Sequence, residues 1–60
     1  MNKLREIRFF KQIIQSRLTL KTGIPQSRIS LIENGLVEPS DDEKKRIAKA
    51  LNVKLEYIFD

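Results

Sequence analysis

Residues 15–34, QSRLTLKTGIPQSRISLIEN, decide the fold of this 60-residue chain. They predict two short helices, at 15–22 and 26–34, joined by a connection of about three residues. Gly23 suits the left-handed backbone conformation that ends a helix. Pro25 suits the opening of the next helix, because its φ is fixed and it has no N–H to leave unpaired. So short a connection makes the two helices cross steeply, which is the helix-turn-helix arrangement.

Start signals place the other helices, and no stretch alternates apolar and polar residues long enough to predict a strand. Asn2 can cap a helix over residues 3–11. Ser40, followed three residues later by Glu43, matches the reciprocal capping pattern that opens a fourth helix, and a last turn or two is expected at 55–59. The sequence therefore predicts an all-α fold, a compact bundle of four to five helices. The expected inward side chains are Leu4, Ile7, Leu18, Ile29, Ile32, Ile47, Ala48, Leu51, Leu55, Ile58 and Phe59.

Length and composition exclude most kinds of enzyme. Sixty residues leave room for one hydrophobic core, so we expect a single domain over residues 1–60. The absence of Cys and His removes thiolate nucleophiles, disulfides, Cys-based zinc sites and the commonest general base. The two glycines are isolated, so no glycine-rich loop can hold a phosphate. We therefore expect no enzymatic activity, no cofactor and no metal.

The sequence also predicts a soluble protein of the cytoplasm. Its strictly apolar runs are pairs such as Phe9-Phe10, against the roughly 20 residues that span a bilayer. Charged residues interrupt the N-terminal stretch MNKLREIRFF, which is unlike an export signal. The lack of Cys is compatible with a reducing compartment.

Charge is distributed unevenly along the chain, whose formal net charge is +4. Residues 1–35 carry seven Lys and Arg against two Glu, whereas residues 36–60 carry five basic against six acidic residues. The basic excess thus lies in the part that holds the predicted helix-turn-helix. Such an asymmetry is typical of a domain that presents one face to a polyanion, although Lys and Arg also simply solubilise helix exteriors.

The helix at 26–34 carries the side chains that sequence-specific DNA recognition needs. The major groove admits one α-helix, and the residues flanking the inward Ile29 and Ile32 would face the bases. Gln can pair with adenine, Arg with guanine and Ser with either, while Leu can touch a thymine methyl. The flanking residues are Gln26, Ser27, Arg28, Ser30 and Leu31.

The ordered spacing of these features resembles the phage-repressor and Cro-like helix-turn-helix family, also called Xre-type. The matching residues need no gap and are 4–8 (LREIR), Gln15, Leu18, 23–24 (GI), 29–30 (IS), 32–35 (IENG), 39–40 (PS), 47–51 (IAKAL), Val53, Leu55 and 58–59 (IF). The resemblance implies a lambda-repressor-like fold of four or five helices. It also implies a small transcriptional regulator, a repressor, that binds double-stranded DNA with helix 26–34 in the major groove.

The resemblance assigns roles to individual residues. The base-reading positions fall on Gln26, Ser27 and Leu31, with Arg28 and Ser30 within reach of backbone or bases. Gln15, which opens the second helix, would contact a phosphate through its backbone N–H and a base through its side chain. Asn34 matches a phosphate-contacting position. Arg8 and Glu33 match an ion pair that ties the first helix to the third, a structural role rather than a binding one.

Several residues depart from the family pattern. Ile14 and Pro25 stand where a Ser, Thr or Asn cap is usual, so both helix starts lose a side-chain acceptor. Thr19 and Thr22 replace a small apolar residue and a Leu. Their hydroxyls are expected either to loosen the packing or to bond back to the helix backbone.

A protein-interaction module, or an antitoxin-like domain that binds a partner with the same fold, is the alternative function. Phe9, Phe10 and Leu20 sit where the family generally has charged residues, which suggests either extra core volume or an association surface. The polar, Arg-bearing face of helix 26–34 favours the DNA-binding regulator. The regulator hypothesis predicts loss of DNA binding in Gln26→Ala with Arg28→Ala. The docking hypothesis predicts loss of partner binding in Phe9→Ala with Phe10→Ala.

One recognition helix reads only a few base pairs, so regulators of this type commonly bind paired half-sites as dimers. We therefore expect a homodimer. It would form through the C-terminal helices, using Tyr57 and Phe59, or only on DNA.

Overall fold

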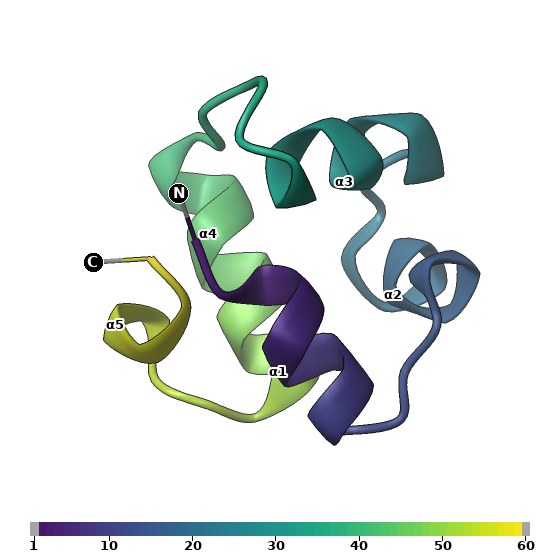
Figure 1. Ribbon diagram of the computed structural model, residues 1–60, viewed down its shortest axis with the longest axis vertical. Coiled ribbons are helices and arrows are strands. Elements are labelled where there is room, and N and C mark those ends of the chain that lie inside the picture. Colours follow the sequence, from purple (N-terminus) through teal and green to yellow (C-terminus); the bar gives the residue numbers. More distant parts are fainter. Residues whose placement is uncertain (1, 60) are drawn as a thin grey trace.

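The computed structural model describes residues 2–59, which form five helices and no strand (Figure 1). The helices are α1 (Leu4–Phe10), α2 (Gln15–Thr22), α3 (Gln26–Glu33), α4 (Asp41–Leu51) and α5 (Leu55–Ile58). The prediction of an all-α bundle is confirmed, and the expected helix bounds are within one residue of these. None of the described helices is long and apolar enough to cross a membrane.

Local signals explain where the helices begin and end. Gly23 closes α2 with a φ of 77°, in the left-handed region. Ser40 and Glu43 form the complete capping box at the start of α4, each side chain accepting the backbone N–H of the other. Asn2 accepts the first backbone N–H of α1 at 3.0 Å, and its amide also donates to the Ile32 carbonyl at 2.9 Å. The N-cap of α1 is Lys3, without a side-chain cap, so Asn2 acts from one residue before it and ties the start of α1 to α3.

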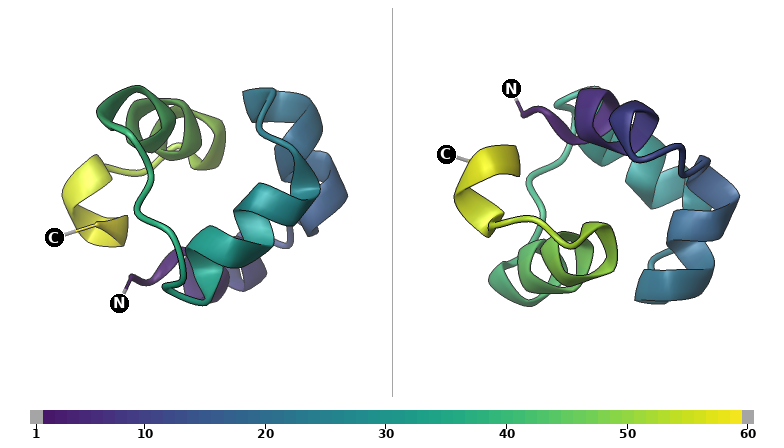
Figure 2. Two further views of the ribbon diagram at one scale, coloured as in Figure 1. Left: turned by 90° about the horizontal axis from the view of Figure 1, so that it is seen from above. Right: turned by 90° about the horizontal axis from the view of Figure 1, so that it is seen from below.

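One apolar core holds the five helices together. α2 packs against both α3 and α4, and α4 packs against α5, while Figure 2 shows α2 and α5 on opposite sides of the bundle. Since helices this short are marginal alone, their stability comes from this shared burial, at roughly 1.5–3 kcal/mol for each large apolar side chain. The core residues, none more than 6% exposed, are Leu4, Leu18, Ile24, Ile29, Ile32, Ile47, Ala48, Leu51 and Ile58.

The two unusual threonines of α2 differ in hydrogen bonding. Thr22 Oγ1 donates to the Leu18 carbonyl at 2.8 Å and accepts the Ile24 N–H at 3.2 Å, so it bonds back to the backbone as expected. Thr19 Oγ1 is also buried, yet it has no hydrogen-bond partner among residues 2–59. A buried hydroxyl without a partner destabilises the fold, because it has given up its hydrogen bonds to water.

The apolar residues at unusual positions do not enlarge the core. Phe9, Phe10 and Leu20 are all exposed, Phe10 to 84%. The expectation of extra core volume is therefore wrong for these three. Phe9 lies beside the buried Arg8, whose guanidinium carbon is 4.9 Å from the centre of the phenyl ring.

Candidate nucleic-acid interface

α2 and α3 form the helix-turn-helix, and α3 crosses α2 rather than running alongside it (Figures 1 and 2). Ile29 and Ile32 fix α3 to the core with no exposed surface. The opposite side of α3 is therefore presented to solvent. Ser27 and Leu31 lie on this side and are exposed, Gln26 is exposed at the first position of α3, and Arg28 and Ser30 are half-buried at the two flanks.

Gln15 joins the start of α2 to both ends of α3. Its amide nitrogen donates to Glu33 Oε1 at 3.1 Å, and its oxygen accepts from the Gln26 amide at 3.4 Å. The Gln15 backbone N–H belongs to the first turn of α2, where N–H groups have no partner inside the helix. The N-cap, Ile14, offers no side-chain acceptor. These N–H groups are therefore available for an anion such as a DNA phosphate.

A buried ion pair between Arg8 and Glu33 joins α1 to the core side of α3. Arg8 Nε donates to Glu33 Oε2 at 2.6 Å and Nη2 donates to Oε1 at 3.3 Å, and the two side chains are 6% and 0% exposed. Arg8 Nη1 also donates to the Ile13 carbonyl at 3.0 Å. The pair expected between α1 and α3 is thus present, and it lies on the core side of α3, away from solvent. Its position suits a structural role.

Asn34, the expected phosphate contact, follows α3 and is held on the surface by Arg5. Arg5 Nη2 donates to Asn34 Oδ1 at 2.8 Å, and Asn34 Nδ2 donates to the Ser30 carbonyl at 2.9 Å. Arg5 therefore places a cation beside Asn34. Sequence reasoning missed Arg5, because the two residues are 29 positions apart and only the packing of α1 against α3 brings them together.

Arg28 is engaged by a carboxylate of α4. Its Nε donates to Glu43 Oε2 at 2.6 Å and its Nη2 to Oε1 at 2.9 Å, with the side chains 38% and 13% exposed. The hydrogen bond from Arg28, followed by that from the Ser40 N–H, lowers the pKa of Glu43 to about 2. Sequence reasoning identified Glu43 only as a helix cap. Nothing along the chain showed that the same carboxylate also binds Arg28.

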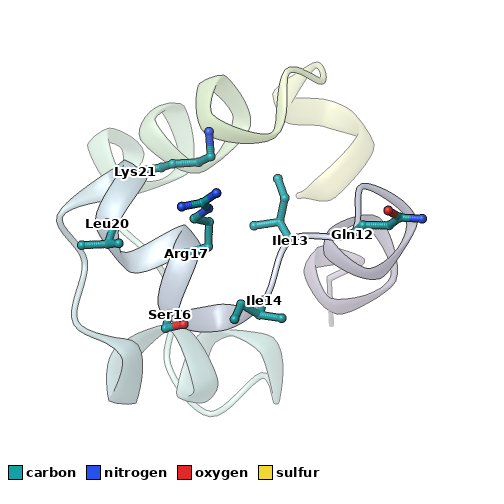
Figure 3. A pocket seen from close by; sticks show the side chains of 7 residues that line it. All are labelled: Gln12, Ile13, Ile14, Ser16, Arg17, Leu20 and Lys21. Atoms are coloured by element: carbon teal, nitrogen blue, oxygen red, sulfur yellow. The ribbon is translucent and has the colours of Figure 1, made fainter.

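An open groove runs along α2 and the segment that joins α1 to α2 (Figure 3). It combines apolar side chains with two cations, Arg17 and Lys21. Among residues 2–59, no group of three acidic side chains lies close enough together to hold a metal ion. The groove is lined by Gln12, Ile13, Ile14, Ser16, Arg17, Leu20 and Lys21.

Comparison with known proteins identifies the family. The helix-turn-helix family model matches residues 10–58. A protein of Methanocaldococcus jannaschii, named as an uncharacterized HTH-type transcriptional regulator, is 38% identical over 58 residues, which are 97% of this chain and 88% of the relative. Both findings agree with the predicted resemblance and with the geometry of α2 and α3. The chain belongs to the helix-turn-helix family of the phage-repressor and Cro-like type.

Proposed function

We propose that this chain binds double-stranded DNA sequence-specifically, as a transcriptional repressor, with α3 in the major groove. Family membership and the regulator relative support DNA-binding transcription regulation. The exposed side of α3 supports the finer proposal, because Gln26, Ser27 and Leu31 face solvent while Ile29 and Ile32 anchor the opposite side. Hydrogen-bonding side chains on a firmly held helix can distinguish bases by their edges in the groove.

The neighbouring groups would position the protein on the phosphates. The first N–H groups of α2, at Gln15, would bind one phosphate. Asn34 and the Arg5 guanidinium beside it would meet another, since Arg and Asn are common phosphate partners. The hydrogen bond between Gln15 and Gln26 would hold both amides in place before DNA arrives. Ser30, on the flank of α3, would contact backbone or bases at the edge of the same footprint.

Fluorescence anisotropy with a random-sequence duplex and a selected pool, over a range of salt concentrations, tests the proposal. We expect tighter binding to the selected pool and a linear fall of log affinity with log salt, with a slope of several units. Gln26→Ala should lower the preference for the selected sequence at one base pair, by about 1–3 kcal/mol. Asn52→Gly is the control, because it also removes an exposed amide, at the left-handed residue that ends α4. Equal binding to both DNAs would contradict sequence-specific recognition.

The proposal includes a homodimer, no catalytic activity and a location in the cytoplasm, with the DNA that it regulates. The exposed Tyr57 on α5 and the neighbouring Phe59 would supply the apolar part of the dimer contact. Sedimentation of the free chain and of its DNA complex measures the number of copies. A monomer under both conditions would contradict the dimer.

Binding of a protein partner is a second candidate function. It is favoured by the exposed Phe9 and Phe10 and by Leu20 in the groove of Figure 3. Gln26→Ala combined with Ser27→Ala should abolish selective DNA binding, whereas Phe9→Ala with Phe10→Ala should leave it intact. If only the second pair impairs binding to a partner protein, that partner docks on the apolar surface and not on α3.

A further inference from the structure

Whether α3 can bind a guanine edge depends on whether the Arg28 guanidinium is free to reach the major groove. Arg28 is the one basic residue within α3, and the Arg guanidinium is the commonest partner of a guanine edge in the major groove. We propose that Glu43 withholds Arg28 from DNA and thereby determines the specificity of α3, an inference that rests on the proposed DNA-binding function. Recognition is then left to Gln26, Ser27 and Leu31.

The contact between the two side chains occupies a complete edge of the guanidinium. Nε and Nη2 of Arg28 donate to the two oxygens of Glu43 at 2.6 and 2.9 Å, which is the bidentate geometry that a guanine would otherwise receive. We call this contact the Arg28–Glu43 clamp. It leaves free only the N–H groups at the tip of the guanidinium, on Nη1 and part of Nη2.

Glu43 is itself held in place. Its Oε1 accepts the Ser40 backbone N–H at 2.9 Å in the capping box, so the carboxylate belongs to the first turn of α4 and does not follow Arg28. It is only 13% exposed. With its pKa lowered to about 2, it stays charged at any pH near neutrality. The position of the Arg28 side chain is therefore set by a charged acceptor that the capping box holds in place.

The clamp lies on the flank of α3 and not at the centre of its exposed side. At 100° per residue, Ser27 and Leu31 point directly away from the buried Ile29, whereas Arg28 is turned toward one edge. At that edge α4 begins, and there Arg28 meets Glu43. The guanidinium is drawn sideways toward α4, while the centre of the α3 surface is left to uncharged side chains.

Glu43→Gln is the variant that opens the clamp, because Gln preserves the capping box but loses the charge and one acceptor. Asp41→Asn is the matched control. It removes a carboxylate from the same turn of α4, and Asp41 makes no ion pair among the described residues. Arg28→Ala and the double variant Arg28→Ala with Glu43→Gln complete the set. Thermal melting of each variant establishes that it is folded.

Anisotropy titrations with the random and the selected duplex measure the effect. We expect Glu43→Gln to bind the random duplex about threefold tighter or more, with a salt slope about one unit steeper, since the freed arginine neutralises one more phosphate. The increase in affinity for the random duplex should be smaller in Asp41→Asn than in Glu43→Gln. Arg28→Ala should bind the random duplex more weakly than the wild type, because it leaves the Glu43 carboxylate unpaired, but it should keep the preference for the selected duplex and cancel the gain of Glu43→Gln. NMR should show the Arg28 Nε–H protected from exchange in the wild type and unprotected in Glu43→Gln.

Other outcomes overturn the inference. Loss of selectivity at one base pair in Arg28→Ala would show that Arg28 reads DNA from within the clamp. A gain in Glu43→Gln that persists without Arg28, or that does not exceed the gain of Asp41→Asn, would reflect charge alone. If the wild type binds and Glu43→Gln gains nothing, only the inference fails. If neither binds at low salt, the proposed function fails as well, whereas binding by Glu43→Gln alone supports the clamp.

Discussion

The carboxylate of Glu33 joins three helices at a single buried point. It accepts hydrogen bonds from Arg8 of α1 and Gln15 of α2, and Arg5 Nε lies 3.5 Å from its Oε1. Because its own side chain has no exposed surface, this charge depends on those donors for its stabilisation. The same cluster sets the position of Gln15 and, through it, of Gln26 on the candidate interface.

Removal of the Arg8 side chain alone should therefore destabilise the fold strongly. We expect Arg8→Met to lower the free energy of unfolding by about 3–5 kcal/mol, since it leaves the Glu33 charge buried and underpaired. The double variant Arg8→Met with Glu33→Leu should lose less, because no charge remains unpaired. Urea denaturation followed by circular dichroism measures both. A double variant as unstable as the sum of its two single variants would contradict this account.

Removal of the Thr19 hydroxyl, which is buried and has no hydrogen-bond partner among the described residues, should stabilise the fold. Thr19→Val keeps the shape of the side chain and removes the buried oxygen, so it should stabilise the fold by about 1 kcal/mol and raise Tm by about 4–8 °C. Thr22→Val is the matched control. It should destabilise, because the Thr22 hydroxyl makes two hydrogen bonds. Equal effects in thermal melts of the two variants would show that the environments of the hydroxyls do not differ.

At the scale of elements, the Arg28–Glu43 clamp ties α3 to the start of α4 through the same carboxylate that caps α4. The two helices are separated by a loop from residue 34 to residue 40, so the pairing is tertiary. The candidate interface on α3 is thus connected to α1 through Glu33 and to α4 through Arg28. Both connections consist of an arginine bound to a carboxylate.

The Arg28–Glu43 clamp should make the stability of the folded chain depend on pH under acidic conditions. The pKa of Glu43 is lower in the folded chain, at about 2, than in the unfolded chain, so its contribution is complete above the unfolded value of 4.5. It is lost as pH falls from there toward 2. We expect wild type to be more stable than Glu43→Gln at pH 7, and the difference in Tm to shrink below about pH 4.5. A difference independent of pH from 7 to 2 would contradict the shift.

At the scale of the whole molecule, size limits what one copy can read. The described chain measures 22 × 22 × 19 Å and presents one recognition helix. Half-sites on successive turns of DNA are about 34 Å apart, so one copy cannot cover two of them. A repressor of this size would need two copies on a paired site.

We therefore expect two chains per duplex that carries both half-sites. A duplex that carries a single half-site should hold two chains if the dimer forms before binding and one chain if it forms only on DNA. Analytical ultracentrifugation at saturating protein concentration measures the stoichiometry. Spacing the half-sites by an additional half-turn should weaken binding, since it places them on opposite faces of the DNA. Saturation of the paired site by a single chain would contradict the dimer proposal.

Helix limits and family were readable from the sequence because their causes are local. Gly23 ends α2 through its own φ, and Ser40 with Glu43 starts α4 through contacts three residues apart. The spacing of apolar residues likewise indicated which side of each helix is buried. The family was expected from a resemblance whose matching residues are spread over residues 4–59, and the family match confirmed it.

Only the tertiary structure decided which charged and polar groups meet. It pairs Arg28 with Glu43 across 15 positions and Arg5 with Asn34 across 29, and it gives the Thr19 hydroxyl no partner among residues 2–59. Spacing along the chain predicts none of these outcomes. The reason is physical: helix ends and periodicity are set within one or two turns of backbone, whereas the partner of a long side chain depends on where the packed core holds each helix.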